Sequence, residues 1–260
     1  MGILNLTPDS FFDGGRFEKP DSALRQTEIM LQEGATIIDL GAMSSRPGSD
    51  EISEVEEAQR LLPVLEALVA AFPEAIFSVD TYRSNIATEA ADRGAAIIND
   101  ISGGTYDDAM LATVAQLGIP YVMMHLQGKP KTMQEQPEYA HVTEEVMLFF
   151  ARQLEKLRLL GAKDVVVDPG FGFGKDLAHN YQLLQDLPQF QILDCLVLVG
   201  VSRKSMINKV LGTRPETALN GTTAAHTIAL MKGANMLRVH DVKEAVQAIK
   251  IVGALPSTTV

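Results

Sequence analysis

The sequence predicts an α/β protein, an eight-stranded parallel β/α (TIM) barrel, and three observations lead to this fold class. The chain has 260 residues, of which 46% are hydrophobic and 21% charged, so it can bury a large core. Amphipathic helical stretches repeatedly end in glycine and run directly into a short apolar segment. These apolar segments are continuous rather than alternating, which is typical of strands covered on both faces in a parallel sheet.

The helix-to-strand unit recurs along the whole chain, and glycine tolerates the left-handed conformation that ends a helix. The helix-ending glycines are Gly34, Gly94, Gly118, Gly161 and Gly233. The expected strands lie near residues 2–6, 35–40, 75–80, 95–99, 119–125, 164–168, 196–201 and 234–239. Eight units in 260 residues give about 32 residues each, which fits a barrel of roughly 250 residues.

A doubly wound sheet is the alternative architecture. That fold usually carries a glycine-rich, phosphate-binding turn after its first strand. Here the first strand ends in Asn5-Leu6-Thr7-Pro8, which favours the barrel. No linker rich in Ser, Gly or Pro divides the chain, so we expect residues 1–260 to form one domain.

Charge and cysteine content limit the partners and the compartment. The net charge of −11 disfavours binding to nucleic acid and to anionic membranes. A single cysteine, Cys195, cannot form an intrachain disulfide, and we expect it to lie in the core of a cytoplasmic protein. The sequence has neither a signal peptide pattern nor an apolar run long enough for a membrane span.

Polar residues follow nearly every expected strand, where a β/α barrel has its active site. They are Asn5, Asp39, Asp80, Asn99, Asp100, His125, Asp168, Ser202, Arg203, Lys204, Arg238 and His240. Any one of them could cap the next helix, but together they predict a small-molecule site at the end of the barrel where the strands terminate, which we call the mouth. The acceptors Asp80, Asn99 and Asp168 suit a flat heterocycle with a row of N–H donors. The cations Arg46, Lys204 and Arg238, with His240, suit an anion such as a phosphate.

Two glycine-containing segments bear on this site. Residues 200–205 leave the seventh strand and open a helix, whose free N–H groups favour an anion, although Ser202 could equally be a capping residue. Residues 170–175 resemble a phosphate loop only superficially, because Asp176 follows Lys175 where a P-loop needs Ser or Thr. As an ordinary loop, this segment could project Phe173 or Lys175 over the mouth.

Eight segments at these strand ends resemble the dihydropteroate synthase family, and they occur in that family's order over essentially the whole chain. They are residues 1–11 (MGILNLTPDSF), 45–48 (SRPG), 78–81 (SVDT), 98–101 (INDI), 124–128 (MHLQG), 168–175 (DPGFGFGK), 202–205 (SRKS) and 238–240 (RVH).

The resemblance implies a β/α barrel enzyme of folate biosynthesis. Such a transferase condenses 6-hydroxymethyl-7,8-dihydropterin pyrophosphate with p-aminobenzoate, giving dihydropteroate and pyrophosphate with the help of Mg²⁺. It also implies a homodimer and a target of sulfonamides.

The resemblance further implies a role for individual positions. The pterin pocket would comprise Asp80, Asn99, Met124, Asp168, Phe173, Lys204 and Arg238. Phe11, Ser45, Pro47 and Ser205 would hold p-aminobenzoate, and Asn5, Arg46, Arg238 and His240 would hold pyrophosphate, Asn5 also binding Mg²⁺. The residues implied to act in catalysis are Asp80, Lys204, Arg238, His240, Asp13 and Arg46, of which Asp13 and Arg46 belong to two loops that close over the reacting centre.

The chain departs from the family pattern at two places. Ser45 stands where relatives usually have Thr, with Ala42-Met43-Ser44 before it, so the fit of p-aminobenzoate could change. Relatives usually carry a short segment before the position of Met1, and we expect its lack to shorten the first strand. A pterin-binding methyltransferase and a pterin-binding module without catalysis remain the alternatives.

Overall fold

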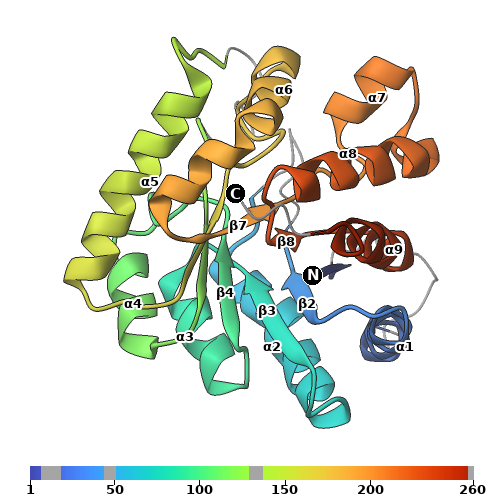
Figure 1. Ribbon diagram of the computed structural model, residues 1–260. Coiled ribbons are helices and arrows are strands. Elements are labelled where there is room, and N and C mark those ends of the chain that lie inside the picture. The colour runs from blue at the N-terminus through green and yellow to red at the C-terminus, as the bar shows by residue number, and fades with distance from the viewer. Residues whose placement is uncertain (7–18, 44–50, 129–136, 257–260) are drawn as a thin grey trace.

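The computed structural model describes residues 1–6, 19–43, 51–128 and 137–256, and within them eight parallel strands pair in sequence order (Figure 1). The strands are β1 (Gly2–Asn5), β2 (Ile37–Gly41), β3 (Ile76–Asp80), β4 (Ile97–Asp100), β5 (Tyr121–Met124), β6 (Val165–Asp168), β7 (Leu196–Val199) and β8 (Met236–Leu237). The sheet closes on itself, because Gly2 forms a parallel bridge with Val239. The Ile3 amide donates to the Val239 carbonyl at 2.9 Å, and the Val239 amide donates to the Met1 carbonyl at 2.9 Å. The predicted eight-stranded barrel is therefore confirmed.

Helices alternate with the strands and surround them on the outside (Figure 1). They are α1 (Lys19–Gln32), α2 (Glu54–Ala71), α3 (Ser84–Asp92), α4 (Met110–Leu117), α5 (Val142–Leu159), α6 (Leu177–Gln185), α7 (Ser205–Leu211), α8 (Leu219–Met231) and α9 (Val242–Gly253). Among the described residues, the 3₁₀ helix η2 (Leu187–Leu193) precedes β7, and the 3₁₀ helix η3 (Pro215–Thr217) precedes α8. In the described part of the chain, no helix combines the length and hydropathy needed to cross a membrane.

The helices begin and end where local chemistry predicts. At the start of α2 the Ser53 hydroxyl accepts from the Glu56 amide at 3.2 Å, and the first turn is acidic. The five glycines expected to end helices all have positive φ; Gly118, for example, closes α4 at φ 66°. At these five positions, the glycines in the sequence therefore predicted where a helix ends, because glycine readily adopts a positive φ.

Side chains of the strands alternate between two apolar layers, and this alternation places the polar residues. The buried residues Ile37, Ile97, Val122, Val166 and Leu198 form one cluster inside the barrel, while a larger cluster lies between strands and helices. Because strand side chains alternate, residues two positions further along share the inner face. These residues are Asp39, Asn99, Met124, Asp168 and Gly200. The polar layer of the mouth thus lies directly above the inner apolar cluster.

The strands are shorter than the expected segments, most clearly in β8, which has two residues against an expected six. Hydrogen bonding nevertheless continues past its ends. The Asn235 amide donates to the Val197 carbonyl at 2.9 Å, and the Arg238 amide donates to the Val199 carbonyl at 3.0 Å. Cys195, expected in the core, is half-buried just before β7 and packs against the outer core cluster from its edge.

Candidate functional site

An ion-pair network at the mouth is centred on Arg238, which follows β8. The Arg238 Nε donates to Asp39 Oδ2 at 2.7 Å, and its Nη2 donates to Asp80 Oδ2 at 2.9 Å. Asn99 completes the network, because its Nδ2 donates to the same Asp39 oxygen at 3.0 Å. One guanidinium therefore joins the ends of β2, β3 and β8 across the opening of the barrel.

Two carboxylates, Asp39 and Asp80, share one guanidinium in this network. Asp39 has no exposed surface, and its Oδ1 has no hydrogen-bond partner among the described residues. Burial, together with the neighbouring charge of Asp39, raises the pKa of Asp80 to about 7 against the lowering effect of Arg238. Arg238 itself is held charged, because Asp39 and Asp80 outweigh its desolvation and raise its pKa. The site is thus prepared to accept hydrogen bonds from a ligand that carries N–H donors.

A second acid-base pair of the mouth consists of Asp168, the last residue of β6, and Lys204, which follows β7. The Gly170 amide donates to Asp168 Oδ1 at 2.8 Å, while burial raises the pKa of Asp168 against the opposing effect of Lys204. Burial likewise lowers the pKa of Lys204 to about 8. A Cβ atom at Gly200 would lie 3.8 Å from both Asp168 Oδ2 and Lys204 Nζ, and 3.9 Å from Arg238 Cβ. Gly200 therefore leaves the space in which these three side chains converge.

The loop after β6 forms part of the wall around Lys204. The Lys204 ammonium donates to the Phe171 carbonyl and lies 4.5 Å from the centroid of the Phe173 ring. Such a cation over an aromatic face is an attractive contact. Met124, buried at the end of β5, packs close to Gly170 of the same loop. Four predicted pocket residues, Met124, Asp168, Phe173 and Lys204, are thus neighbours in the structure.

Ser202 and His240 lie together beside this cluster. The His240 amide donates to the Ser202 Oγ at 3.2 Å, and the His240 Nδ1 lies 3.0 Å from the same oxygen. Ser202 therefore orients a histidine rather than capping α7, whose N-cap is Lys204. Desolvation, followed by the charge of Arg238, lowers the pKa of His240, so the ring is neutral at pH 7.

Of the other polar residues that follow the strands, Asn5 and Ser205 are predicted site residues, whereas Asp100 has a structural role. Asn5 ends β1 half-buried on the inner face of the barrel, and Ser205 is exposed at the start of α7. Asp100, in contrast, accepts from the Ser102 and Gly104 amides at 2.7 and 2.8 Å and from the Tyr121 hydroxyl at 2.7 Å, so it stabilises a turn behind the site. Five predicted site residues, Phe11, Asp13, Ser45, Arg46 and Pro47, lie outside the described residues.

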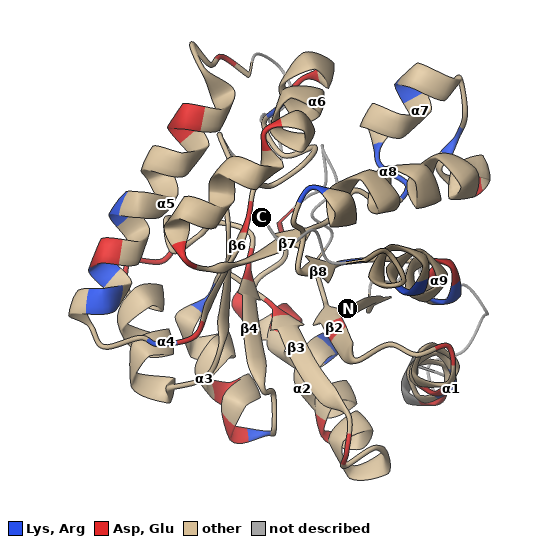
Figure 2. Ribbon diagram, in the orientation of Figure 1, with Lys and Arg blue, Asp and Glu red and all other residues tan. Residues whose placement is uncertain are grey.

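Sequence reasoning missed two contributions to the site. It placed Asp39 at the mouth but assigned it no ligand or partner, although this residue is the fixed partner of Arg238. It also expected that Lys175 could project over the mouth, whereas the structure buries it to 2% exposure against His125. A lysine beside several glycines suggests a side chain exposed to solvent. The burial of Lys175 is explained only by the loop after β6, which folds back onto β5. Figure 2 shows charged residues on the outer helices and also on strands in the middle of the barrel.

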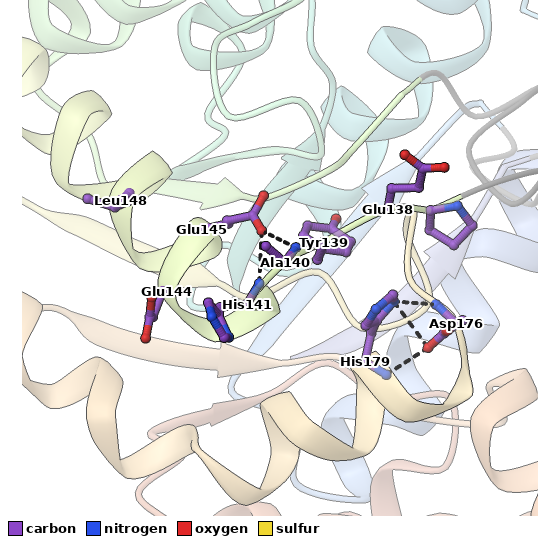
Figure 3. A pocket seen from close by; sticks show the side chains of 10 residues that line it. Glu138, Tyr139, Ala140, His141, Glu144, Glu145, Leu148, Asp176 and His179 are labelled. Carbon is purple, nitrogen blue, oxygen red and sulfur yellow. Dashed lines mark hydrogen bonds and ion pairs between the residues drawn. The ribbon is translucent and has the colours of Figure 1, made fainter.

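A surface hollow of about 860 Å³ lies between the starts of α5 and α6 (Figure 3). Glu138, His141, Glu145, Asp176 and His179 are among its lining residues. Its polar groups are largely engaged with each other: Asp176 accepts from the His179 amide at 2.7 Å, and Glu145 accepts from the Ala140 and His141 amides. None of the predicted site residues lines this hollow, so the barrel mouth remains the candidate site.

Comparisons with known proteins show the family to which the chain belongs. Residues 1–240 match the family model described as pterin binding enzyme. The chain is 48% identical to the dihydropteroate synthase of Escherichia coli (strain K12) over 256 residues, which cover 98% of this chain and 90% of that protein. It is 46% identical to the Haemophilus influenzae dihydropteroate synthase over 96% of this chain and 91% of that protein.

Solved structures show the same similarity in three dimensions. The Yersinia pestis dihydropteroate synthase, in complex with a sulfonamide drug, superposes with a TM-score of 0.91 at 45% identity, over 97% of this chain and 92% of that chain. The Xanthomonas albilineans dihydropteroate synthase with 4-aminobenzoic acid superposes with a TM-score of 0.91 at 38% identity. This superposition covers 98% of this chain and 93% of that chain. By sequence and by structure, the chain belongs to the pterin-binding enzyme family and, within it, to the dihydropteroate synthases.

Proposed function

We propose that the protein is a transferase of folate biosynthesis that condenses 6-hydroxymethyl-7,8-dihydropterin pyrophosphate with p-aminobenzoate, giving dihydropteroate and pyrophosphate. The observation that carries this proposal is the division of one mouth into acceptors and cations. Asp80, Asn99 and Asp168 present oxygen acceptors, and Lys204 and Arg238 present charged donors beside them. A pterin pyrophosphate carries the complementary pair, a donor edge and an anionic tail.

Asp168 is the acceptor best placed for the pterin. Its Oδ1 is held by the Gly170 amide, and its Oδ2 faces the space above Gly200. Burial raises the pKa of Asp168 and so disfavours its ionised form. The paired N–H donors of a pterin would offset this effect, because they form charge-assisted hydrogen bonds with the ionised carboxylate. Asp80 and Asn99 extend the acceptor row, Lys204 faces the pterin carbonyl, and Met124 and Phe173 line the pocket.

Arg238 links pterin binding to the leaving group. In the structure its Nη2 is bound to Asp80, while its Nε remains with Asp39. A pterin that engages Asp80 would release Nη2, which could then bind the pyrophosphate while Asp39 keeps the guanidinium in place. Arg238 and the neighbouring His240, with Arg46 from outside the described residues, would stabilise the charge that develops on the leaving group.

The reaction then needs positioning more than proton transfer. The C–O bond to pyrophosphate breaks with its electron pair, leaving a pterin methylene cation that the carboxylates Asp80 and Asp168 stabilise. The neutral aryl amine of p-aminobenzoate forms the C–N bond with its lone pair and releases a proton to solvent. Because this nucleophile needs no prior deprotonation, a strong general base is not required.

The residues fit a magnesium ion that is shared with the substrate. The described residues contain no group of three or more His, Cys, Asp or Glu side chains that could hold a metal ion by themselves. Mg²⁺ often binds through one or two protein oxygens together with substrate phosphates. The Asn5 amide oxygen, half-buried at the end of β1, can supply such a ligand. When bound, Mg²⁺ would neutralise the pyrophosphate as it leaves.

The p-aminobenzoate site rests mainly on residues outside the described part of the chain. Ser205 is the described member, exposed at the first turn of α7, where backbone N–H groups favour the carboxylate of this substrate. Phe11, Ser45 and Pro47 would enclose its ring, and Asp13 and Arg46 would close over the reacting centre. A Ser45→Thr variant tests the departure from the family pattern, with a lower KM for p-aminobenzoate as the expected result.

A homodimer in the cytoplasm completes the proposal. Apolar side chains on α7 and α8 are exposed, among them Val210, Leu211, Ile228 and Met231, and a second copy of the chain could cover them. The unpaired Cys195 is consistent with a reducing compartment. Sedimentation equilibrium tests the dimer; we expect twice the chain mass of 28.2 kDa, and a single-chain mass at micromolar concentration would contradict it.

The activity is tested by pyrophosphate release from the pterin pyrophosphate with Mg²⁺, with and without p-aminobenzoate, while dihydropteroate is followed by mass spectrometry. Equal amounts of pyrophosphate and dihydropteroate are expected. Pterin binding without product would support the silent binding module instead. Transfer of a methyl group from a methylated pterin, with no dihydropteroate formed, would support the methyltransferase.

A further inference from the structure

Lys175 is a fully buried cation that the proposed reaction does not use. It lies between β6 and α6, and only 2% of its surface is exposed. An ammonium group in such a position is strongly disfavoured unless its donors are satisfied. The contacts that satisfy it therefore indicate what the residue contributes.

Neutral acceptors surround the Lys175 ammonium. Its Nζ lies 3.0 Å from His125 Nδ1 and donates to the Phe173 carbonyl at 3.0 Å and to the His125 carbonyl at 3.3 Å. No carboxylate of the described residues forms a salt bridge with it, although the more distant Asp168 opposes the effect of burial on its pKa. Three N–H donors thus meet three acceptors on two segments, the end of β5 and the loop after β6.

The protonation state and orientation of the His125 ring allow it to accept a hydrogen bond from Lys175. Burial, followed by the charge of Lys175, lowers the pKa of His125 to about 2, so the ring is neutral. With Nδ1 accepting from the ammonium, the ring proton is placed on Nε2. The ring also packs edge-on against Phe149 at 5.0 Å, which fixes its orientation.

The loop held by Lys175 runs unusually close to β5. Gly170 has φ 73°, and a Cβ atom there would lie 2.0 Å from the His125 carbonyl oxygen. The following residues bend sharply, with the Phe173 amide donating to the Gly170 carbonyl at 3.1 Å. The same loop supplies the Phe171 carbonyl and the Phe173 ring, the two groups that contact Lys204.

We propose that Lys175 is a positioning residue for pterin binding: by tying the Phe173 carbonyl to His125, it holds the loop of residues 170–174 against β5 and so fixes Phe173 and the Phe171 carbonyl around Lys204. This inference rests on the proposed function, since it assumes that the mouth binds a pterin. Lys175 forms no hydrogen bond with Asp168 or Lys204, so its contacts reach the pocket through the loop, while its charge also lowers the pKa of Asp168.

The test uses Lys175→Met, which keeps the aliphatic stem and removes all three donors. Binding of 6-hydroxymethylpterin is measured by calorimetry, and the steady-state constants are measured for both substrates. We expect pterin affinity to fall about tenfold and the KM for the pterin substrate to rise in step, because a buried donor set is lost and the wall of the pocket shifts. We expect kcat and the KM for p-aminobenzoate to change less than about threefold.

Three further variants keep the test decisive. His125→Phe removes the Nδ1 acceptor but preserves an aromatic ring against Phe149; we expect a smaller loss of pterin affinity, about threefold. The double variant should bind pterin no more weakly than Lys175→Met alone, because both changes break the same contact. Lys163→Met, at an exposed lysine before β6, is the matched control for loss of charge and should bind as the wild type does.

The outcomes separate this inference from the proposed function. If the wild-type protein does not bind the pterin, the proposed function fails. If the wild type binds but Lys175→Met and His125→Phe bind equally well, the positioning role is refuted. A purely structural role is indicated if kcat falls with the folded fraction while the KM for the pterin substrate is unchanged, and this result also overturns the inference.

Discussion

Replacing Arg238 by methionine should destabilise the protein strongly, because Arg238 is the only described cation that directly bridges Asp39 and Asp80. Methionine fills much of the volume of the arginine stem but offers no donor. Asp39, which has no exposed surface, would keep only its hydrogen bond from Asn99. The variant therefore isolates the charge compensation at the mouth from the packing around it.

The magnitude follows from the burial of the partners. The Arg238 side chain is 20% exposed, and those of Asp39 and Asp80 are 0% and 14% exposed, so solvent screens the pair only weakly. Removing one partner of a buried ion pair typically costs about 3–5 kcal/mol. Asp80 can relieve part of this by taking a proton, since its pKa is already raised by burial to about 7. We therefore expect a loss of about 3 kcal/mol in the free energy of unfolding.

The assay is urea unfolding followed by circular dichroism at pH 7.5, on the wild type, Arg238→Met, Asp39→Asn and the double variant. The double variant should recover part of the loss, because the uncompensated charge of Asp39 is removed along with its partner. A loss below about 1 kcal/mol in Arg238→Met, or strictly additive effects in the double variant, would refute the reasoning.

Three other variants test the ligand roles and the electrostatics of the site. Asp168→Asn should weaken pterin binding at least about tenfold, because an ionic acceptor becomes a neutral amide; unchanged affinity by calorimetry would exclude Asp168 from the pocket. Arg238→Ala, measured on the folded fraction, should lose more affinity for pyrophosphate than for free dihydropterin and should lose turnover; equal loss of both ligands would mean that Arg238 acts only as the structural partner of Asp39 and Asp80. Because the pKa of His125 is lowered to about 2, the unfolded chain binds an extra proton below about pH 6.5. Between pH 7 and pH 4 the wild type should therefore lose on the order of 3 kcal/mol of stability relative to His125→Phe. Parallel stability curves in urea titrations would contradict this.

The sequence could predict the barrel and most of the mouth because both follow from short-range patterns. Glycine in the left-handed conformation follows α1, α3, α4, α5 and α8, and continuous apolar runs mark the strands. Strand alternation then places Asn99 and Asp168 on the same inner face as Ile97 and Val166. These features need only the identity of residues a few positions apart.

The remaining features depend on contacts between distant segments. Arg238 and Asp39 are 199 positions apart, and nothing in either local pattern indicates that one oxygen would serve both Arg238 and Asn99. The burial of Lys175 likewise follows from the approach of its loop to His125, 50 positions earlier. Ser202 could be a cap or a ligand residue from its sequence context, and only the structure shows it holding His240.

The most direct test of the division between acceptors and cations is a crystal structure of the protein with 6-hydroxymethyl-7,8-dihydropterin pyrophosphate and Mg²⁺. We predict the pterin donor edge on Asp80, Asn99 and Asp168, with the pyrophosphate on Arg238 and His240 and the Arg238–Asp80 contact replaced. A ligand seated instead in the hollow between α5 and α6, with the Arg238–Asp80 ion pair intact, would contradict the account.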